Sequence, residues 1–169
     1  MKNLLFDRII PAKRNKKKAD SPIKNYEHRQ LGPKDLDLAL AMNHGFRRGL
    51  VHEEAAGLFL ANPKNWLFTC LDSKKVLAFA YGYELDRLDP RGPMLYIHEL
   101  GVLPSYQHQG LGQEFMEALL ERARGAGISK VFLITHKHNQ PACHLYEKIG
   151  GQAMVGSQDD DRVYVFFLE

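Results

Sequence analysis

Three residues suited to anion binding stand directly before a segment with helical spacing. Gln107, Gly110 and Gly112 lie in the stretch Ser-Tyr-Gln-His-Gln-Gly-Leu-Gly, and apolar residues spaced for one helix face follow. The first N–H groups of a helix have no partner inside it, so they can hold a phosphate where glycine lets the anion reach the backbone. No Gly-Lys-Ser/Thr follows, which excludes a Walker loop. Alone, the pattern leaves two interpretations open: a phosphate-binding turn, or a flexible glycine-rich start of a helix.

Such a turn needs a strand before it and a helix after it. Residues 94–102 predict the strand, and a helix with one apolar stripe is expected from Leu111 to the glycines at 125–127. Aromatic and β-branched runs joined by a polar turn predict a hairpin of strands 66–71 and 76–85. Further strands are expected at 26–31, 130–136 and 163–168, the second of them of the buried type, and further helices at 33–43, 52–60 and 141–148. This alternation predicts an α/β domain.

Length and composition favour one globular domain in a reducing compartment. The chain has 169 residues, of which 44% are hydrophobic, and its two cysteines are too few for a disulfide framework. No apolar run has the ~20 residues of a membrane span, and the first residues do not form a secretory signal. We therefore expect a cytoplasmic protein that does not enter a membrane.

The positive charge is concentrated at the start of the chain. Residues 1–30 contain nine Lys/Arg and three Asp/Glu, a net charge of +6, whereas the remainder carries −3. No aromatic side chain alternates with the cluster at 13–18 to stack on bases. Residues 1–25 are therefore predicted to be a solvated, partly disordered arm, and nucleic acid is not the expected partner.

Three motifs in the same order resemble the GCN5-related N-acetyltransferases, the GNAT family. Gln107-x-x-Gly110-x-Gly112 resembles the family's pyrophosphate loop, and the strand at 98–104 resembles its central strand. The segment at 139–150 matches the family's Asn-x-x-Ala-x-x-Leu-Tyr-x-Lys-x-Gly at every fixed position. The resemblance extends over residues 26–169. It implies a central mixed, mostly antiparallel, splayed sheet flanked by helices.

The resemblance also implies acetyl-CoA as the acetyl donor. The family's cofactor contacts fall on the central strand, the glycine turn and the start of the later helix. In this chain they correspond to Leu100, Gly101, Val102, Gln107, His108, Gln109, Gly110, Leu111, Gly112, Gln113, Asn139 and Tyr146.

Within the family, the sequence is most similar to GNAT-type aminoglycoside 3-N-acetyltransferases. Tyr83-Glu84-Leu85 and the strand at 95–102 resemble their third and fourth strands. The chain departs from that group at Glu99, which replaces Asp, at Gly101, which replaces Ala, and at Gln107, which replaces Arg. Since Gln107 brings no charge to a phosphate, cofactor affinity could be lower. These departures affect the expected substrate more than the expected reaction.

Amine acetylation requires a group that accepts a proton. A primary ammonium has a pKa near ~10.4, so about one molecule in two thousand carries a free lone pair at neutral pH. Glu99 is the candidate base, directly or through water, although it could instead be a structural carboxylate that pairs an arginine such as Arg91. Glu84 on the adjoining strand could share this role or attract a cationic substrate.

Two further roles complete the expected catalytic set. A backbone N–H of Leu100 or Val102 is the candidate donor to the developing oxyanion. By resemblance, Tyr146 gives a proton or a hydrogen bond to the departing CoA thiolate; otherwise it is a tyrosine at the edge of the core. His98 is expected on the opposite face of the strand from Glu99. Cys143 is expected to be a small buried residue.

The sequence does not determine the identity of the acceptor amine. Acidic residues at 84, 86, 89, 99 and 159–161 could line a mouth for a polycation such as an aminoglycoside or a polyamine, or they could be solvated loop residues. A peptide amine is the enzymatic alternative, and an acyl-CoA-binding module without turnover is the alternative of another class. His136 and His138 share a strand face, but no further ligand stands at metal spacing, so no metal is expected. A homodimer is among the assemblies left open.

Overall fold

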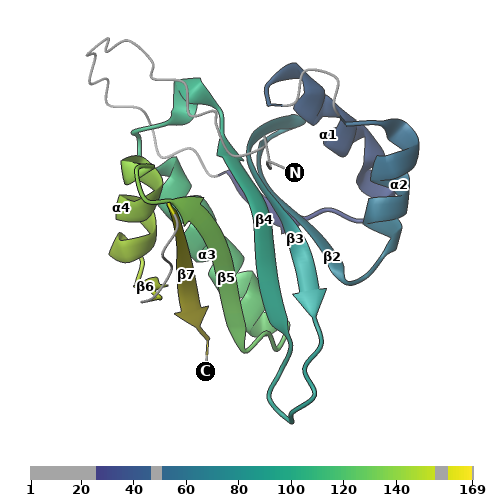
Figure 1. Cartoon of the computed structure of the whole chain (residues 1–169). Helices are drawn as coiled ribbons and strands as arrows, with labels where there is room; N and C mark the ends of the chain where they lie inside the picture. The colour runs from purple at the N-terminus through teal and green to yellow at the C-terminus, as the bar shows by residue number, and fades with distance from the viewer. Residues whose placement is uncertain (1–25, 47–50, 155–159, 169) are drawn as a thin grey trace.

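The fold is organised around one seven-stranded sheet (Figure 1). The computed structural model describes residues 26–46, 51–154 and 160–168, so the predicted basic arm at 1–25 lies outside the described residues. The strands stand in the order β1-β2-β3-β4-β5-β7-β6. Their bounds are β1 (Glu27–Gln30), β2 (Asn65–Asp72), β3 (Lys75–Leu85), β4 (Met94–Val102), β5 (Lys130–His136), β6 (Gln152–Ala153) and β7 (Asp161–Phe167).

The pairing within this sheet confirms the predicted architecture. β4 and β5 run parallel, and the other neighbouring pairs are antiparallel. The strands expected from the apolar runs are all present, with ends that differ by a residue or two. β6 was not predicted, because it has two exposed residues and no periodic pattern. The predicted buried character of 130–136 is wrong in part, since β5 alternates between buried and half-buried residues.

Helices cover both faces of the sheet. In Figure 1, α1 (Leu36–Ala41) and α2 (Glu53–Ala61) lie over β2 and β3, whereas α3 (Leu111–Gly125) and α4 (Gln140–Lys148) lie on the opposite face. The described residues also form three short 3-10 helices: η1 (Pro33–Asp35), η2 (Met42–His44) and η3 (Pro104–Tyr106). The helix predicted over 33–43 is therefore divided into η1, α1 and η2. None of the helices in the described ranges is long and apolar enough to cross a membrane.

Each face of the sheet has its own buried cluster. Leu111, Phe115 and Leu119 form the predicted apolar stripe of α3 and pack on alternate residues of β4 and β5, such as Leu95 and Val131. On the other face, α1 and α2 pack on β2 and β3 through a second cluster that includes Phe79. The strands of the middle of the sheet are thus held from both sides, which keeps the residues at their ends in place.

Candidate active site

The parallel strands β4 and β5 separate toward their carboxyl ends. Met94 to Ile97 pair with Lys130 to Leu133, and the pairing ends there. β4 continues to pair with β3 as far as Val102, and β5 continues to pair with β7 as far as His136. Residues 98–102 therefore have β3 on one side and an opening on the other. This is the splay that the resemblance implied.

The direction of the backbone groups along β4 follows from one hydrogen bond at its end. The N–H of Leu103 donates to the carbonyl of Leu77 on the β3 side, at 2.9 Å. In an antiparallel pair, alternate residues direct their N–H and C=O groups to opposite sides. The N–H groups of Leu100 and Val102 therefore point away from β3, into the opening between β4 and β5. These are the two donors that the sequence predicted for an oxyanion.

A β-bulge interrupts the pairing of β3 and β4 at His98. Tyr81 pairs with Glu99, whereas the next residue, Gly82, pairs with Ile97, so His98 is the extra residue on β4. A Cβ at Gly82 would lie 1.9 Å from the carbonyl oxygen of Tyr96, so a side chain is excluded where the strands approach. A glycine inside a strand pattern is a signal for a bulge or a close approach of backbones. Gly82 was thus the signal from which this bulge could have been found.

The bulge places His98 and Glu99 on the same face of the sheet. The His98 ring is 5.2 Å from the ring of Tyr81, which is the paired partner of Glu99. Directly paired residues share a face of the sheet, so His98 and Glu99 lie on the same face. The prediction that His98 points to the opposite face from Glu99 is therefore wrong. It assumed strict alternation, which an inserted residue breaks.

The glycine turn between η3 and α3 adopts left-handed backbone conformations at two residues. His108 has φ 59° and Gly110, the residue before α3, has φ 89°. Within the described part of the chain, no backbone hydrogen bond is donated by residues 108–112, and Gln113 is the first to donate, to the carbonyl of Gly110. Left-handed residues and free N–H groups at a helix start are features of anion-binding turns.

Gln107 makes a contact that the sequence did not predict. Its side-chain nitrogen donates to the carbonyl of Val102 at 2.9 Å, which ties the turn back to the end of β4. This bond takes up the Val102 carbonyl that faces the opening. The Gln107 side chain therefore helps to position the turn against the strand.

The three motifs converge at Gly112. A Cβ built on Gly112 would lie 3.6 Å from Leu145 of α4 and 3.8 Å from Val102 of β4. The start of α3, the end of β4 and the middle of α4 are thus in contact. Leu145 immediately precedes Tyr146, so the predicted cofactor strand, glycine turn and tyrosine helix form one continuous region.

Tyr146 is buried between α4 and β7. Its ring is 5.3 Å from that of Tyr164 and 6.5 Å from that of Phe166. Burial raises the pKa of the Tyr146 phenol well above its ordinary value, so this hydroxyl keeps its proton at neutral pH. Asn139, the residue before α4, donates from its side chain to Thr135 at the end of β5, at 3.2 Å. That contact fixes the start of α4 beside the opening.

The acidic residues do not form one mouth. Glu84 pairs with Leu95, whose side chain packs on the α3 face, so Glu84 faces away from Glu99. Asp86 pairs with Lys64, and Asp89 binds Arg87 and Arg91 near the tip of the β3–β4 hairpin. Hydrogen bonds from Arg91 and Arg87 hold the pKa of the Asp89 carboxyl well below its usual range.

Asp161 lies at the other end of the sheet from that hairpin. It pairs with His136, whereas the hairpin end of β5 is Lys130, which pairs with Met94. The Asp161 carboxylate is 3.0 Å from the Nδ1 atom of His136. The suggestion that one acidic mouth includes both sets is therefore wrong, and Asp159 lies outside the described residues.

The predicted metal and cysteine residues can also be located. The rings of His136 and His138 stack with centroids 5.4 Å apart. In the described ranges, no group of three or more His, Cys, Asp or Glu side chains is arranged to hold a metal ion. Cys143 is buried on α4, as expected, and its sulfur lies 3.7 Å from the carbonyl of His136.

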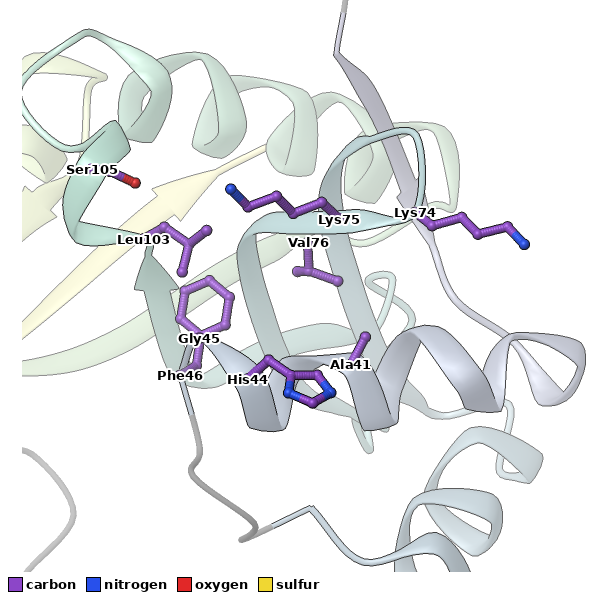
Figure 2. A pocket seen from close by; sticks show the side chains of 9 residues that line it. All are labelled: Ala41, His44, Gly45, Phe46, Lys74, Lys75, Val76, Leu103 and Ser105. Carbon is purple, nitrogen blue, oxygen red and sulfur yellow. The ribbon is translucent and has the colours of Figure 1, made fainter.

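A cavity of about 590 Å³ lies beside the end of β4 (Figure 2). It opens between η2, the turn after β2 and the residue that follows β4. Its lining is mainly apolar with lysines at the rim: Ala41, His44, Gly45, Phe46, Lys74, Lys75, Val76, Leu103 and Ser105. None of the predicted catalytic or cofactor-binding residues lines it. We therefore place the candidate active site at the opening between β4 and β5.

Known proteins resemble the chain in sequence and in fold. The chain is 33% identical over 94 residues to the N-alpha-acetyltransferase RimI of Mycobacterium tuberculosis, a match that covers 55% of this chain and 56% of RimI. It is 30% identical over 67 residues to the thialysine N-epsilon-acetyltransferase of Mus musculus, covering 40% of this chain and 39% of that enzyme. The matches thus span about half or less of these relatives.

Solved structures match a larger part of the chain. An aminoglycoside acetyltransferase from an uncultured soil metagenomic sample, in complex with trehalose, superposes with a TM-score of 0.71 at 20% identity, covering 79% of this chain and 93% of that one. Arabidopsis thaliana NAA60 in complex with acetyl-CoA superposes with a TM-score of 0.64 at 19% identity, covering 85% and 98%. At this level of identity the likeness shows the fold alone.

A family model settles the relationship. The acetyltransferase (GNAT) family model matches residues 35–151. That segment includes the splayed end of β4, the glycine turn and α4. Because the match takes in more than half of the chain and all three of its motifs, the chain belongs to the GNAT family of acetyltransferases.

Proposed function

We propose that this chain transfers an acetyl group from acetyl-CoA to the primary amine of a small cationic substrate, by direct attack within a ternary complex. The observation that carries the proposal is the convergence at Gly112 of the splayed strand, the anion-binding type of turn and the tyrosine helix. These features match the parts of acetyl-CoA. Backbone N–H groups can bind its phosphates, a free strand edge can pair with its extended pantetheine chain, and hydrogen-bond donors can lie near its acyl carbon.

The residues present fit acetyl-CoA as the second substrate. The free N–H groups of residues 108–112 would hold the pyrophosphate, and the exposed edge of β4 would pair with the amide groups of the pantetheine arm. Acetyl-CoA supplies the activated thioester when bound. The N–H of Leu100 or Val102, which points into the opening, would donate to the oxyanion that develops on the acyl group.

Two side chains complete the proposed chemistry. Glu99 would accept a proton from the acceptor ammonium, directly or through water, because a nitrogen attacks only as the neutral amine. Tyr146 would donate a hydrogen bond to the leaving sulfur. Its raised pKa keeps the hydroxyl protonated but makes full proton transfer to a thiolate unfavourable, so hydrogen bonding is its expected role. Glu84 has no part in this proposal, since it faces the other side of the sheet.

The acceptor class has two candidates. The similarity of the β3–β4 sequence to aminoglycoside acetyltransferases favours an aminoglycoside. A peptide amine is favoured by a different observation: the acidic residues of the β3–β4 hairpin are paired with Lys64, Arg87 and Arg91, far from Glu99, so they do not support polycation binding there. The relative RimI is named an N-alpha-acetyltransferase.

An assay of CoA thiol release tests the proposal. The parent protein is incubated with acetyl-CoA and a panel of aminoglycosides, polyamines and short peptides. Glu99→Gln and Tyr146→Phe are run beside it, with Glu84→Gln as a matched carboxylate control on the opposite face. We expect turnover on one amine class, lowered at least tenfold by the first two variants and less than twofold by the control. Binding of acetyl-CoA without turnover on any amine would favour a binding module instead.

A further inference from the structure

Four aromatic rings gather on the face of the sheet that carries Glu99. The His98 ring is 5.2 Å from the Tyr81 ring, 6.2 Å from the Tyr83 ring and 5.8 Å from the Tyr96 ring. The Tyr96 hydroxyl and the Nδ1 atom of His98 are 3.3 Å apart. All four side chains are half-buried, so each ring keeps part of its surface in contact with solvent.

The bulge and α2 hold this group together. With strict alternation, Glu99 would face the α3 side of the sheet, as Leu95 and Ile97 do; the extra residue on β4 instead places it on the face of His98. Phe59 of α2 packs edge-on against Tyr81 at 5.8 Å and against Tyr83 at 5.9 Å, which fixes the two β3 rings from outside. The rings thus have defined positions rather than the freedom of exposed side chains.

Such a group has the chemistry of an ammonium site. The faces of aromatic rings carry partial negative charge and attract cations within about 6 Å of the ring centre. Glu99 stands on the same face, paired with Tyr81, and adds a carboxylate. Alkyl alcohols of the same shape would gain little from these features.

We infer that Tyr81, Tyr83, Tyr96 and His98 form the subsite that binds the ammonium group of the acceptor beside Glu99. The inference rests on the proposed function, which it deepens by naming the group that is recognised: a primary alkylammonium held by aromatic rings. The rings determine specificity for a cationic nitrogen, and Tyr96 positions His98 through its hydroxyl. The hairpin carboxylates have no role in this recognition.

Binding of n-butylammonium tests the subsite without requiring turnover. The imidazole NMR signals of His98, assigned with His98→Gln, are followed during titration with n-butylammonium chloride, and n-butanol serves as the uncharged probe. We expect saturable shifts with the ammonium and much smaller shifts with the alcohol. Equal shifts with both probes, or no saturable shift with the ammonium, would overturn the inference.

Variants at Tyr83 separate the ring face from the hydroxyl. Tyr83→Phe keeps the ring and should change n-butylammonium affinity less than twofold, whereas Tyr83→Leu removes it and should weaken binding roughly three- to tenfold. Phe167→Leu, on the exposed part of β7, is the control for loss of a ring elsewhere and should leave affinity unchanged. Thermal melts confirm that each variant folds. Equal affinity in the Phe and Leu variants would overturn the role of the ring.

The two proposals fail in different ways. If n-butylammonium binds as expected but no amine is acetylated, the subsite stands and the acetyltransferase function does not. If the parent acetylates an amine and Tyr83→Leu retains its KM for that amine, the function stands and the subsite is overturned.

Discussion

At the scale of single residues, Tyr146 combines burial with a proposed role at the leaving group. Its ring contacts Tyr164 and Phe166, and burial raises the pKa of its phenol above the ordinary value. A raised pKa means that the hydroxyl stays protonated through neutral and mildly alkaline pH. The side chain can therefore act as a hydrogen-bond donor over the whole range in which an acetyltransferase would be assayed.

Tyr146→Phe is expected to lower kcat at least tenfold while the Kd for acetyl-CoA changes less than twofold. The phenyl ring fills the same space, so packing is kept and only the donor is lost. Steady-state kinetics and calorimetric titration measure the two quantities. Because Tyr146 remains protonated, its titration should not affect kcat between pH 7 and 9. The parent and Tyr146→Phe should therefore have pH profiles of kcat with the same shape in this range. A fall in kcat of the parent in this range that is absent from Tyr146→Phe would contradict the raised pKa of Tyr146.

At the scale of elements, Asp35 joins β1 to the first helical segment. It accepts hydrogen bonds from the Arg29 guanidinium, the nearer at 2.9 Å, and from the N–H of Gly32 at 2.8 Å. The bonds from Arg29 lower the pKa of the Asp35 carboxyl below its usual value, with a smaller contribution from Gly32. A carboxyl with a lowered pKa in the folded state stabilises the fold only while it is ionised.

Asp35→Asn should therefore reduce the free energy of unfolding by about 1 kcal/mol at pH 7. The difference from the parent is fully present above the carboxyl's unfolded pKa, ~4, and is lost as the pH falls through the lower pKa of the folded state. Urea denaturation at several pH values measures it. Asp37→Asn, at an exposed position of α1, is the control. A difference that grows toward low pH would contradict the assignment.

The bulge between β3 and β4 depends on Gly82. Gly82→Ala would bring a Cβ within 1.9 Å of the Tyr96 carbonyl oxygen, and a backbone atom cannot move aside as a flexible side chain can. We expect a loss of about 2 kcal/mol or more in chemical denaturation. Gly57→Ala in α2 has no atom within 4 Å and should be neutral or slightly stabilising. Equal stability of the two variants would show that the bulge tolerates a side chain.

At the scale of the whole molecule, Cys70 reports on the integrity of the core. It lies on β2 with no exposed surface, and burial raises the pKa of its thiol to about 12. Only the thiolate reacts with alkylating reagents, so both access and ionisation are suppressed in the folded protein. Its modification thus requires the two-sided packing of the sheet to open.

Native protein treated with iodoacetamide at pH 8 should remain unmodified at Cys70, as measured by peptide mass spectrometry. Modification should become complete in urea that unfolds the chain. A cysteine introduced as Leu58→Cys, at a position that is 70% exposed, gives the rate for an accessible thiol in the same molecule. Rapid labelling of Cys70 in the native state would mean that the sheet opens locally.

The sequence alone predicted much of the fold because those features depend on local pattern. Alternating and continuous apolar runs predicted the strands that became β2, β3 and β4, and the stripe beginning at Leu111 predicted α3. The glycine turn was predicted because glycine lets an anion reach the backbone N–H groups at a helix start, and the structure adds that Gly110 is left-handed. The motif order also identified the family, which the match over residues 35–151 confirms.

The tertiary structure decided which of these residues meet. His98 and Glu99 share a face only because β4 has one extra residue relative to β3, and strict alternation along β4 cannot reveal such an insertion. Glu84 and Glu99 look alike in sequence but face opposite sides of the sheet, and the hairpin carboxylates are neutralised by arginines and a lysine. Side-chain periodicity can be derived from the sequence of one strand, whereas register and ion pairing depend on the relative position of two segments. The sequence by itself therefore determined the elements and the family, and only the packed sheet determined the composition of the site.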